Sequence, residues 1–376
     1  MKARIVLLHL SLIDGVGPAT IAKIVAVLAQ DDAVWSALYT MMVSALIDRF
    51  QISRAIAQKI EIGLQNSALL TDELELIRVH EVNWVTVLDQ EYPALLRFIY
   101  TPPSVLYWHG SYLHDVSSQS IAIVGSRRAN HYGQRVINKL VPQLVERNYT
   151  IVSGGAVGAD TMVHRAVVDR RGKTIVVLGS GLLRVYPRVN IPLFQDVVAT
   201  GGAVVSIFPL TTQALPGNFP ARNRVIAGLS KACVVVQAAA HSGAAITATY
   251  ALEQGRDVFA VPGPIDDELS VGCHALIKEG ATLLSDISDI IGNPQEQKMV
   301  TQAVLHNAET PDFSFGIAKE SSELRDPLLS LCDIPRSVDE LVLLSGTSFT
   351  VVQDKLFELQ LDGLVTQDFT GMWITR

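Results

Sequence analysis

The sequence predicts an α/β protein in which a parallel sheet is preceded and followed by smaller helical modules. Six apolar, β-branched runs begin between residues 121 and 257, at intervals of 23 to 30 residues, with helical patterns between most of them. The runs are apolar along their whole length, which is typical of parallel strands covered by helices on both faces. Glycine turns follow several runs, and ligands of such sheets bind beyond the carboxyl ends of the strands.

Residues 1–75 are expected to form a module of short helices. Apolar residues recur there with the spacing i, i+3 and i+4 after a turn at 14–18. The helical patterns cover 20–25, 34–48 and 53–64. The first apolar stretch follows Lys2 and Arg4, as in a signal peptide. His9 and the absence of a small-residue cleavage site favour a buried first helix instead.

The central region, 79–292, is expected to form one domain. Its first part, 79–118, is rich in turn signals such as Pro93, Pro102 and Pro103, so we expect a connecting segment there. The strands are expected to be joined by right-handed crossovers. The six strand sequences are IAIVGS from 121, TIVSG from 150, KTIVVLGS from 173, GAVVSIFP from 202, ACVVVQAAA from 232 and DVFAVPG from 257.

The last part of the chain is expected to be a linker followed by a small domain. Residues 293–325 lose periodicity, which favours a linker. Within 326–376, helical patterns and a hairpin pattern around Thr370 and Gly371 follow one another, as in a winged helix. The helices are expected at 328–332, 337–344 and 349–361, and the hairpin at 366–375. This last part of the chain is acidic, which weakens the case that it binds DNA.

Charge is distributed unevenly along the chain. The whole protein carries −7, but residues 121–240 hold 14 Lys and Arg against 4 Asp and Glu, a net +10 that leaves −17 for the rest. A basic region with glycine turns suits a polyanion such as a nucleic acid or a nucleotide. The alternative is that these arginines are scattered over solvated helix faces.

Cysteine usage and hydropathy limit the protein class. The three cysteines stand far apart, with no CxxC and no Cys/His cluster, so neither a zinc site nor a disulfide framework is expected. A reduced, cytoplasmic setting fits best. No apolar run reaches the roughly 18 residues of a membrane span, so no membrane association is expected.

Two turns at strand ends are candidate phosphate seats. Gly125, Ser126 and Arg127 follow the strand at 121 and offer main-chain N–H groups, a hydroxyl and a guanidinium. The second turn begins with Ser153 and Gly154, whose backbone can approach a ligand closely. Farther along this second turn, a carboxylate and an imidazole four residues apart suggest a metal or, without a third ligand nearby, a structural pair. These two residues are Asp160 and His164.

The segment PGNFPARNR, from residue 216, is the most specific of these patterns. Phe219 is expected to lie exposed in a Gly/Pro loop, followed by Arg222, Asn223 and Arg224. An aromatic face for a base and cations for phosphates are the means by which proteins bind single-stranded nucleic acid. The alternative is that Phe219 fills the core between strands.

A fourth turn follows the strand at 232. Ser242 is expected to cap a helix over 244–254, so that free N–H groups near Gly243 face a phosphate, and Thr247 can add a hydroxyl contact or pack. The chain has no GxSxG, HExxH, GxGxxG or Walker GxxxxGK[ST] motif. Nothing therefore indicates catalysis, a cofactor or a metal.

Taken in order, these segments resemble the DNA-processing protein A (DprA/Smf) family. The shared motifs run from IVGSR at Ile123 through SG-x-A-x-G-x-D, YP, FP-x-RNR-x-IAGLS, SG-x-x-IT and GR-x-VFAVPG to Ala281. The resemblance implies an extended Rossmann fold, an N-terminal sterile-alpha-motif (SAM-like) helical domain and a C-terminal winged-helix (DML1-like) domain. It also implies a homodimer.

The resemblance implies a binding and loading role rather than an enzyme. The family protects incoming single-stranded DNA and helps to load RecA during natural transformation, and single-strand-binding protein is a further candidate partner. Carried onto this chain, Arg127 would hold phosphate, Phe219 would stack on a base, and Arg222 and Arg224 would line the groove. Donors would come from Ser153, Gly154, Ser242, Gly243 and Thr247.

Four positions depart from the family pattern. Val157 stands where a basic residue is frequent, Gly155 replaces an apolar residue, and Ile207 and Gln237 stand where acids are common. Losing the cation puts one phosphate contact in doubt, while losing two acids makes the rim less negative. We therefore expect a DNA groove with altered local contacts.

Two other hypotheses stay open. A nucleotide N-ribohydrolase of the lysine-decarboxylase-like type shares the layout, but its PGGxGTxxE signature would need an acid in the loop after Ser242, where Glu253 comes a turn too late. The terminal modules could also make the protein an interaction scaffold.

Overall fold

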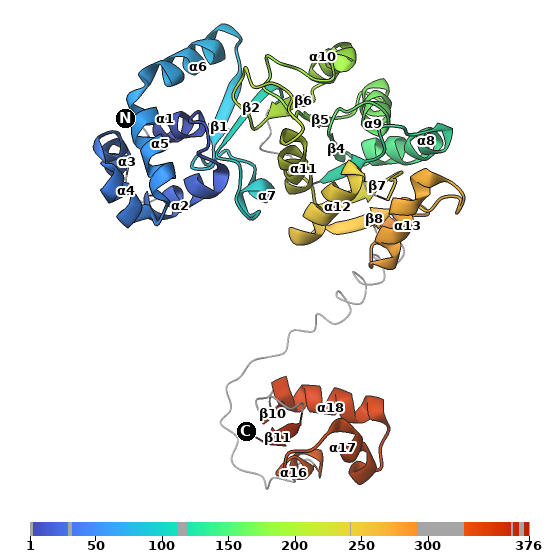
Figure 1. Ribbon diagram of the computed structural model, residues 1–376. Coiled ribbons are helices and arrows are strands. Elements are labelled where there is room, and N and C mark those ends of the chain that lie inside the picture. The colour runs from blue at the N-terminus through green and yellow to red at the C-terminus, as the bar shows by residue number, and fades with distance from the viewer. Residues whose placement is uncertain are drawn as a thin grey trace, which may run out of the picture. The chain divides into compact units, whose positions relative to one another are not determined.

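The computed structural model describes residues 3–28, 32–111, 119–240, 242–291, 327–361, 364–367 and 372–375 (Figure 1). The chain divides into two compact units, Met1–Val304 and Leu305–Arg376. The expected linker at 293–325 and the expected hairpin turn at Thr370 and Gly371 lie outside the described residues.

The first unit is built on a nine-stranded sheet, as far as its described residues show, in the order β1-β2-β6-β5-β4-β3-β7-β8-β9. All six predicted strands are present, and they pair in parallel. They are β3 (Ser120–Val124), β4 (Thr150–Ser153), β5 (Thr174–Val177), β6 (Ala203–Ser206), β7 (Ala232–Val235) and β8 (Asp257–Ala260). A short strand, β9 (Thr282–Leu283), pairs in parallel with β8.

The prediction that 79–118 only connects was wrong. Two strands, β1 (Asn83–Thr86) and β2 (Val105–Gly110), lie in this segment with the short helix α7 (Ala94–Arg97) between them. β2 pairs antiparallel with both β1 and β6, so the sheet is mixed rather than wholly parallel. The prolines of this segment stand between the strands, where they break neither ladder.

Helices cover both faces of the sheet, because successive residues of each strand point to opposite sides. In β3, Ile121 and Ile123 pack on one face with α8 (His131–Glu146) and α9 (Ala159–Asp169). Ala122 and Val124 pack on the other face, which three helices cover. These are α11 (Asn218–Gly228), α12 (Gly243–Glu253) and α13 (Val271–Lys278). The remaining short elements are η3 (Arg188–Asn190), α10 (Ile191–Ala199), η4 (Glu268–Ser270) and α14 (Ser288–Ile291).

The N-terminal helices belong to the same compact unit as the sheet. The first helix is buried, as expected, and the pattern at 34–48 is divided into two helices and a 3-10 turn. The helices are α1 (Ala3–Ser11), α2 (Pro18–Leu28), α3 (Asp32–Ala37), η1 (Leu38–Thr40), α4 (Val43–Phe50), α5 (Arg54–Gln65) and α6 (Ser67–Val79). α6 runs past the expected boundary at 75, and its Leu70 and Ile77 share a core cluster with Tyr107 of β2. The helical module therefore packs against the sheet, in part through Tyr107.

The second unit contains the helices and the strands that its pattern predicts. They are α16 (Pro327–Leu331), α17 (Val338–Ser345), α18 (Phe349–Leu361) and the antiparallel pair β10 (Val365–Gln367) and β11 (Trp373–Thr375). Ser337 and Glu340 form a capping box at the start of α17. Leu341, Leu356 and Trp373 are buried in one small core.

Candidate functional site

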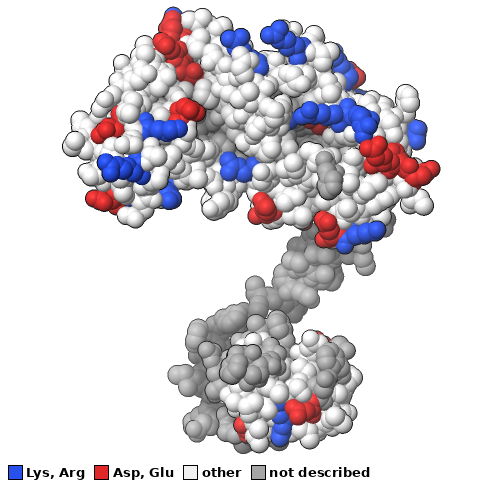
Figure 2. Space-filling model, viewed as in Figure 1, with Lys and Arg blue, Asp and Glu red and all other residues white. Residues whose placement is uncertain are grey.

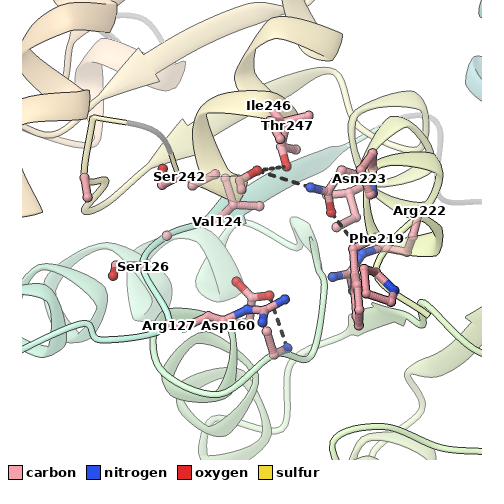
Figure 3. Close-up of a pocket in the computed structure, with 18 of the residues that line it drawn as sticks. Val124, Ser126, Arg127, Asp160, Phe219, Arg222, Asn223, Ser242, Ile246 and Thr247 are labelled. Carbon is pink, nitrogen blue, oxygen red and sulfur yellow. Dashed lines mark hydrogen bonds between the residues drawn. The ribbon is translucent and has the colours of Figure 1, made fainter. Parts of the chain in front are cut away.

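A cavity of about 710 Å³ opens at the carboxyl ends of the parallel strands (Figure 3). Its walls are the turn after β3, the start of α9, the loop and first turns of α11, and the turn between β7 and α12. Nine of the twelve predicted site residues line it. They are Gly125, Ser126, Arg127, Phe219, Arg222, Asn223, Ser242, Gly243 and Thr247.

The turn after β3 presents Arg127 to the cavity. Ser126 is fixed from both sides, because its N–H donates to Gln237 O at 2.7 Å and its Oγ accepts from Arg128 N at 3.0 Å. Asn130 then caps α8 by accepting from the main-chain N–H groups of residues 132 and 133. The guanidinium of Arg127 remains exposed, and Arg128 forms an exposed ion pair with Glu268 at 2.7 Å.

The second glycine turn supports the first one, and Asp160 at its end also lines the cavity. The Oγ of Ser153 is buried and donates to Ile123 O at 2.7 Å, so the prediction that Ser153 offers a donor to a ligand was wrong. Gly158 has φ +86°, and a Cβ there would collide with the backbone of Arg127. Asp160, in the first turn of α9, accepts from Ala156 N at 3.2 Å. The structural interpretation of this carboxylate therefore fits its contacts.

Arg222 lines the cavity, but its guanidinium is already bound within the protein. The residue is 4% exposed. Its Nη1 donates to the carbonyl oxygens of Gly154 and of Val177, the latter at 2.6 Å, and its Nε donates to Asn223 Oδ1 at 3.0 Å. The role of Arg222 in binding DNA stays a prediction, and its Nη1 and Nε are used within the protein because these carbonyls at the ends of two strands need a buried donor.

Phe219 lies in the first turn of α11 and not in an exposed loop. It is half-buried, and a Cβ at Gly179 would lie 2.8 Å from its ring, so the ring packs on the backbone after β5. The guanidinium carbons of Arg127 and Arg222 lie 5.2 Å and 5.8 Å from the ring centroid. Tyr186 meets the ring edge-on with centroids 6.0 Å apart.

Arg224 does not reach the cavity, contrary to the prediction. Successive residues of a helix point about 100° apart. Asn223 therefore faces the turn before α12, where its Nδ2 donates to Gly243 O at 3.1 Å. Arg224 turns the other way and its Nη1 donates to Tyr100 O at 3.4 Å. Gly154, also predicted as a site residue, lines a small adjoining pocket with Arg127 and Phe219.

The turn after β7 presents the start of α12 to the cavity. Ser242 caps the helix as predicted, since its Oγ accepts from Ala245 N at 3.3 Å. Gly243 is exposed, whereas Thr247 is buried and its Oγ1 donates to Gly243 O at 3.2 Å. Thr247 therefore packs and supports the turn.

The buried groups beneath the cavity have shifted pKa values. Burial lowers the pKa of Arg222 to about 10, although the charge of Asp160 opposes this shift. Burial also raises the pKa of Asp160, opposed by Arg222. Burial, with a contribution from Arg222, lowers the pKa of His164 to about 3. Among the described residues no group of three His, Cys, Asp or Glu side chains could hold a metal.

Tyr186 is an aromatic residue of the cavity that the predicted site did not include. It lines both the main cavity and the adjoining pocket and is 48% exposed. The signal was available, because the Tyr-Pro pair follows β5 and the loops after parallel strands share one edge of the sheet.

Figure 2 shows a band of Lys and Arg side chains over the region of β4 and α9.

Comparisons with known proteins agree on one family. Residues 83–295 match the family model described as DNA recombination-mediator protein A. The chain is 33% identical over 385 residues to the protein Smf of Synechocystis sp., covering 95% of each. It is similar to the crystal structure of DNA processing protein A from Streptococcus pneumoniae, with TM-score 0.66, 34% identity, 78% of this chain and 99% of that chain covered. A Helicobacter pylori DNA processing protein A, whose structure describes a single-stranded DNA binding mode, aligns with TM-score 0.51, 25% identity, 59% of this chain and 97% of that chain covered.

Among the described residues no helix is long and apolar enough to cross a membrane.

Proposed function

This chain belongs to the DNA recombination-mediator protein A family, and from that premise we propose that it is a single-stranded DNA-binding recombination mediator and not an enzyme. In this proposal it protects incoming single strands and loads RecA during natural transformation. It acts as a homodimer, with single-strand-binding protein as a further candidate partner. The single-stranded DNA binding of the Helicobacter pylori relative supports the choice of ligand.

The observation that carries the proposal is the exposed guanidinium of Arg127 above the aromatic pair of Phe219 and Tyr186. A single strand offers phosphates and unpaired bases together, and a cation beside aromatic faces binds both. Arg127 takes a phosphate in this proposal. The half-exposed ring of Tyr186 and the cavity side of Phe219 take a base.

The glycine turns contribute main-chain donors. The N–H groups at the start of α12, after Ser242 and Gly243, are not all used within the helix and can meet a phosphate. Gly125 and Ser126 keep the backbone of the first turn close to the same cavity. Arg222 and Asn223 hold the walls in place and do not contact DNA through their bound groups.

The terminal modules complete the proposal. We take 1–75 as a SAM-like domain that precedes the Rossmann domain at 79–292. The linker at 293–325 then leads to 326–376, which we take as a winged-helix (DML1-like) domain. The helices and the paired strands of the second unit support the winged-helix assignment.

Binding of single- and double-stranded oligonucleotides at about 50 mM and about 200 mM salt tests the proposal. We expect preferential binding of the single strand and an affinity that falls with salt, because each neutralised phosphate releases counterions. Arg127→Ala should reduce the magnitude of the log–log salt slope by about 0.7 per lost contact. Val189→Ala, which changes a residue that is 72% exposed, serves as the control. Binding that is absent, or unaffected by salt, would falsify the proposal.

A further inference from the structure

A loop on the other side of α11 from the cavity displays two aromatic side chains. Phe98 is 82% exposed and Tyr100 is 92% exposed, whereas Ile99 between them is 5% exposed. The loop follows α7, which lies beside α11 in Figure 1 and contacts it. Two neighbouring exposed aromatic rings on a folded protein are typical of a binding surface.

The loop is held firmly from beneath. Leu96 and Ile99 pack against Gly228 of α11, where a Cβ would lie 2.5 Å from Leu96 Cδ1. Arg97 Nη1 donates to Val87 O at 2.9 Å, and Arg256 Nη2 donates to Leu95 O at 3.1 Å. The rings are thus presented by a fixed backbone, and a ligand that binds them does not have to order the loop.

Two arginines contact the main chain of this segment. Arg224 Nη1 donates to Tyr100 O at 3.4 Å and Arg256 Nη2 to Leu95 O, while the Nε atoms of both are buried and have no hydrogen-bond partner within the described residues. Burial is the main cause that lowers the pKa of both guanidinium groups, which remain cationic at neutral pH. An aromatic pair on a loop that Arg224 contacts offers chemistry similar to that of the cavity, namely flat faces for bases and charge for phosphates.

The surface adjoins the cavity through one helix and the start of the next. Asn223 faces the cavity wall and the next residue, Arg224, faces the aromatic loop. On α12, which packs against α11, Ile246 lines the cavity, and Tyr250 lies one turn farther on, where its hydroxyl opposes the lowering of the pKa of Arg224 by burial. A chain that leaves the cavity over the first turns of α12 therefore comes to Arg224 and then to Tyr100.

We propose that Phe98 and Tyr100, with Arg224, form a second contact surface for the same single strand of DNA, on which bases outside the cavity stack. This inference rests on the proposed function of the cavity. Its ligand is the continuing strand, so it contributes to the binding of long oligonucleotides and not of short ones.

The test compares thymidine oligomers of about 4 and about 16 nucleotides by fluorescence anisotropy. The variants are Phe98→Ala/Tyr100→Ala, the ring-keeping Phe98→Tyr/Tyr100→Phe, and Phe98→Leu/Tyr100→Leu, which keeps apolar bulk but no ring. Met42→Ala, at an exposed apolar position in the helical module, is the control. The alanine and leucine variants should bind the long oligomer about tenfold more weakly, or about 1.4 kcal/mol. They should bind the short oligomer as the wild type does, and the ring-keeping variant should bind both normally.

Three results overturn the proposal. The first is wild-type affinity of the alanine variant for the long oligomer. The second is an equal loss on both lengths, and the third is normal binding by the leucine variant, which would show that apolar bulk is sufficient and that bases do not stack on the rings. Arg127→Ala separates the two proposals, because it should weaken binding at both lengths. If Arg127→Ala has no effect at either length, the cavity proposal fails, whatever the loop variants do.

Discussion

Arg127 and Arg222 approach the same phenylalanine ring from two walls of one cavity, yet their environments are opposite. Arg127 is exposed and has no hydrogen-bond partner among the described residues, while Arg222 is 4% exposed and donates to two main-chain carbonyls and one amide oxygen. Both belong to the basic stretch 121–240. A positive residue beside a cavity can therefore serve the fold or a ligand, and only its partners tell which.

The contrast between these two arginines also changes how the net charge of +10 on residues 121–240 is interpreted. Arg165 is paired with Asp196 at 3.0 Å, Arg128 with Glu268 at 2.7 Å, and Lys139 with Asp286 at 3.2 Å. Two of these acids lie outside the basic stretch, so the folded protein neutralises part of the charge that the sequence places there. Among the described residues that line the cavity, Arg127 is the exposed cation outside an ion pair, since Arg128 is paired and Arg222 is buried.

Replacing Arg222 should have the largest effect. Arg222→Leu leaves two carbonyls unpaired and the buried Asp160 without its nearby positive charge, and breaking a buried ionic arrangement typically costs about 3–5 kcal/mol. We expect urea denaturation to show a loss of this size in the free energy of unfolding. Arg127→Leu should change it by less than about 0.5 kcal/mol, as exposed positions do. If Arg222→Leu is as stable as the wild type and only DNA binding is lost, the two arginines do not differ as described.

The buried region around Arg222 should also make the stability of the protein depend on pH. His164 lies near Arg222, and its pKa of about 3 in the folded protein compares with 6.5 for an exposed histidine. Above pH 6.5 both states are neutral, and below it the unfolded chain takes up a proton that the folded protein does not. Stability should fall by about 1.4 kcal/mol per pH unit as the pH decreases from 6.5 towards about 3.

Comparing wild type with His164→Gln isolates this proton. Urea denaturation at pH 7.5, 6 and 5 should show the wild type losing about 2 kcal/mol more than the variant between the first and the last pH. His9 and His109, whose pKa values burial also lowers, contribute equally to both proteins. Parallel pH profiles would show that the pKa of His164 is the same in the folded and the unfolded protein.

The ring between the arginines gives the next smaller effect. Phe219→Ala removes the surface that lies under Arg127 and should weaken single-strand binding about tenfold, since stacking on an aromatic contributes about 1–3 kcal/mol per base. Phe219→Tyr keeps the ring and should retain most of the affinity. An equal loss in both variants would indicate that the packing of the ring on Gly179, and not its face, matters for binding.

The sequence predicted the parallel part of the sheet and its rim of turns because continuous apolar runs and glycines carry that information locally. It did not predict β1 and β2, which are short and separated by prolines, and whose pairing with β6 depends on contacts distant in sequence. The sequence predicted where the site lies, but not the role of each residue in it. Whether Arg222, Arg224 or Ser153 faces a ligand or a carbonyl is decided by tertiary packing, which residue type does not encode.

The smallest effect concerns Arg128, which stands between the two extremes because it is exposed yet paired. Both side chains of the Arg128–Glu268 pair are 70% exposed, so the pair should contribute less than about 1 kcal/mol to stability. Replacing one or the other member of this pair should change the affinity for DNA in opposite directions. Arg128→Ala should weaken single-strand binding slightly, whereas Glu268→Gln should strengthen it about twofold at low salt, because it removes a negative charge and frees a guanidinium at the cavity rim. At about 1 M salt, where screening acts within about 3 Å, the Glu268→Gln gain should vanish. A gain that persists there would mean that Glu268 acts on binding through the shape of the turn and not through its charge.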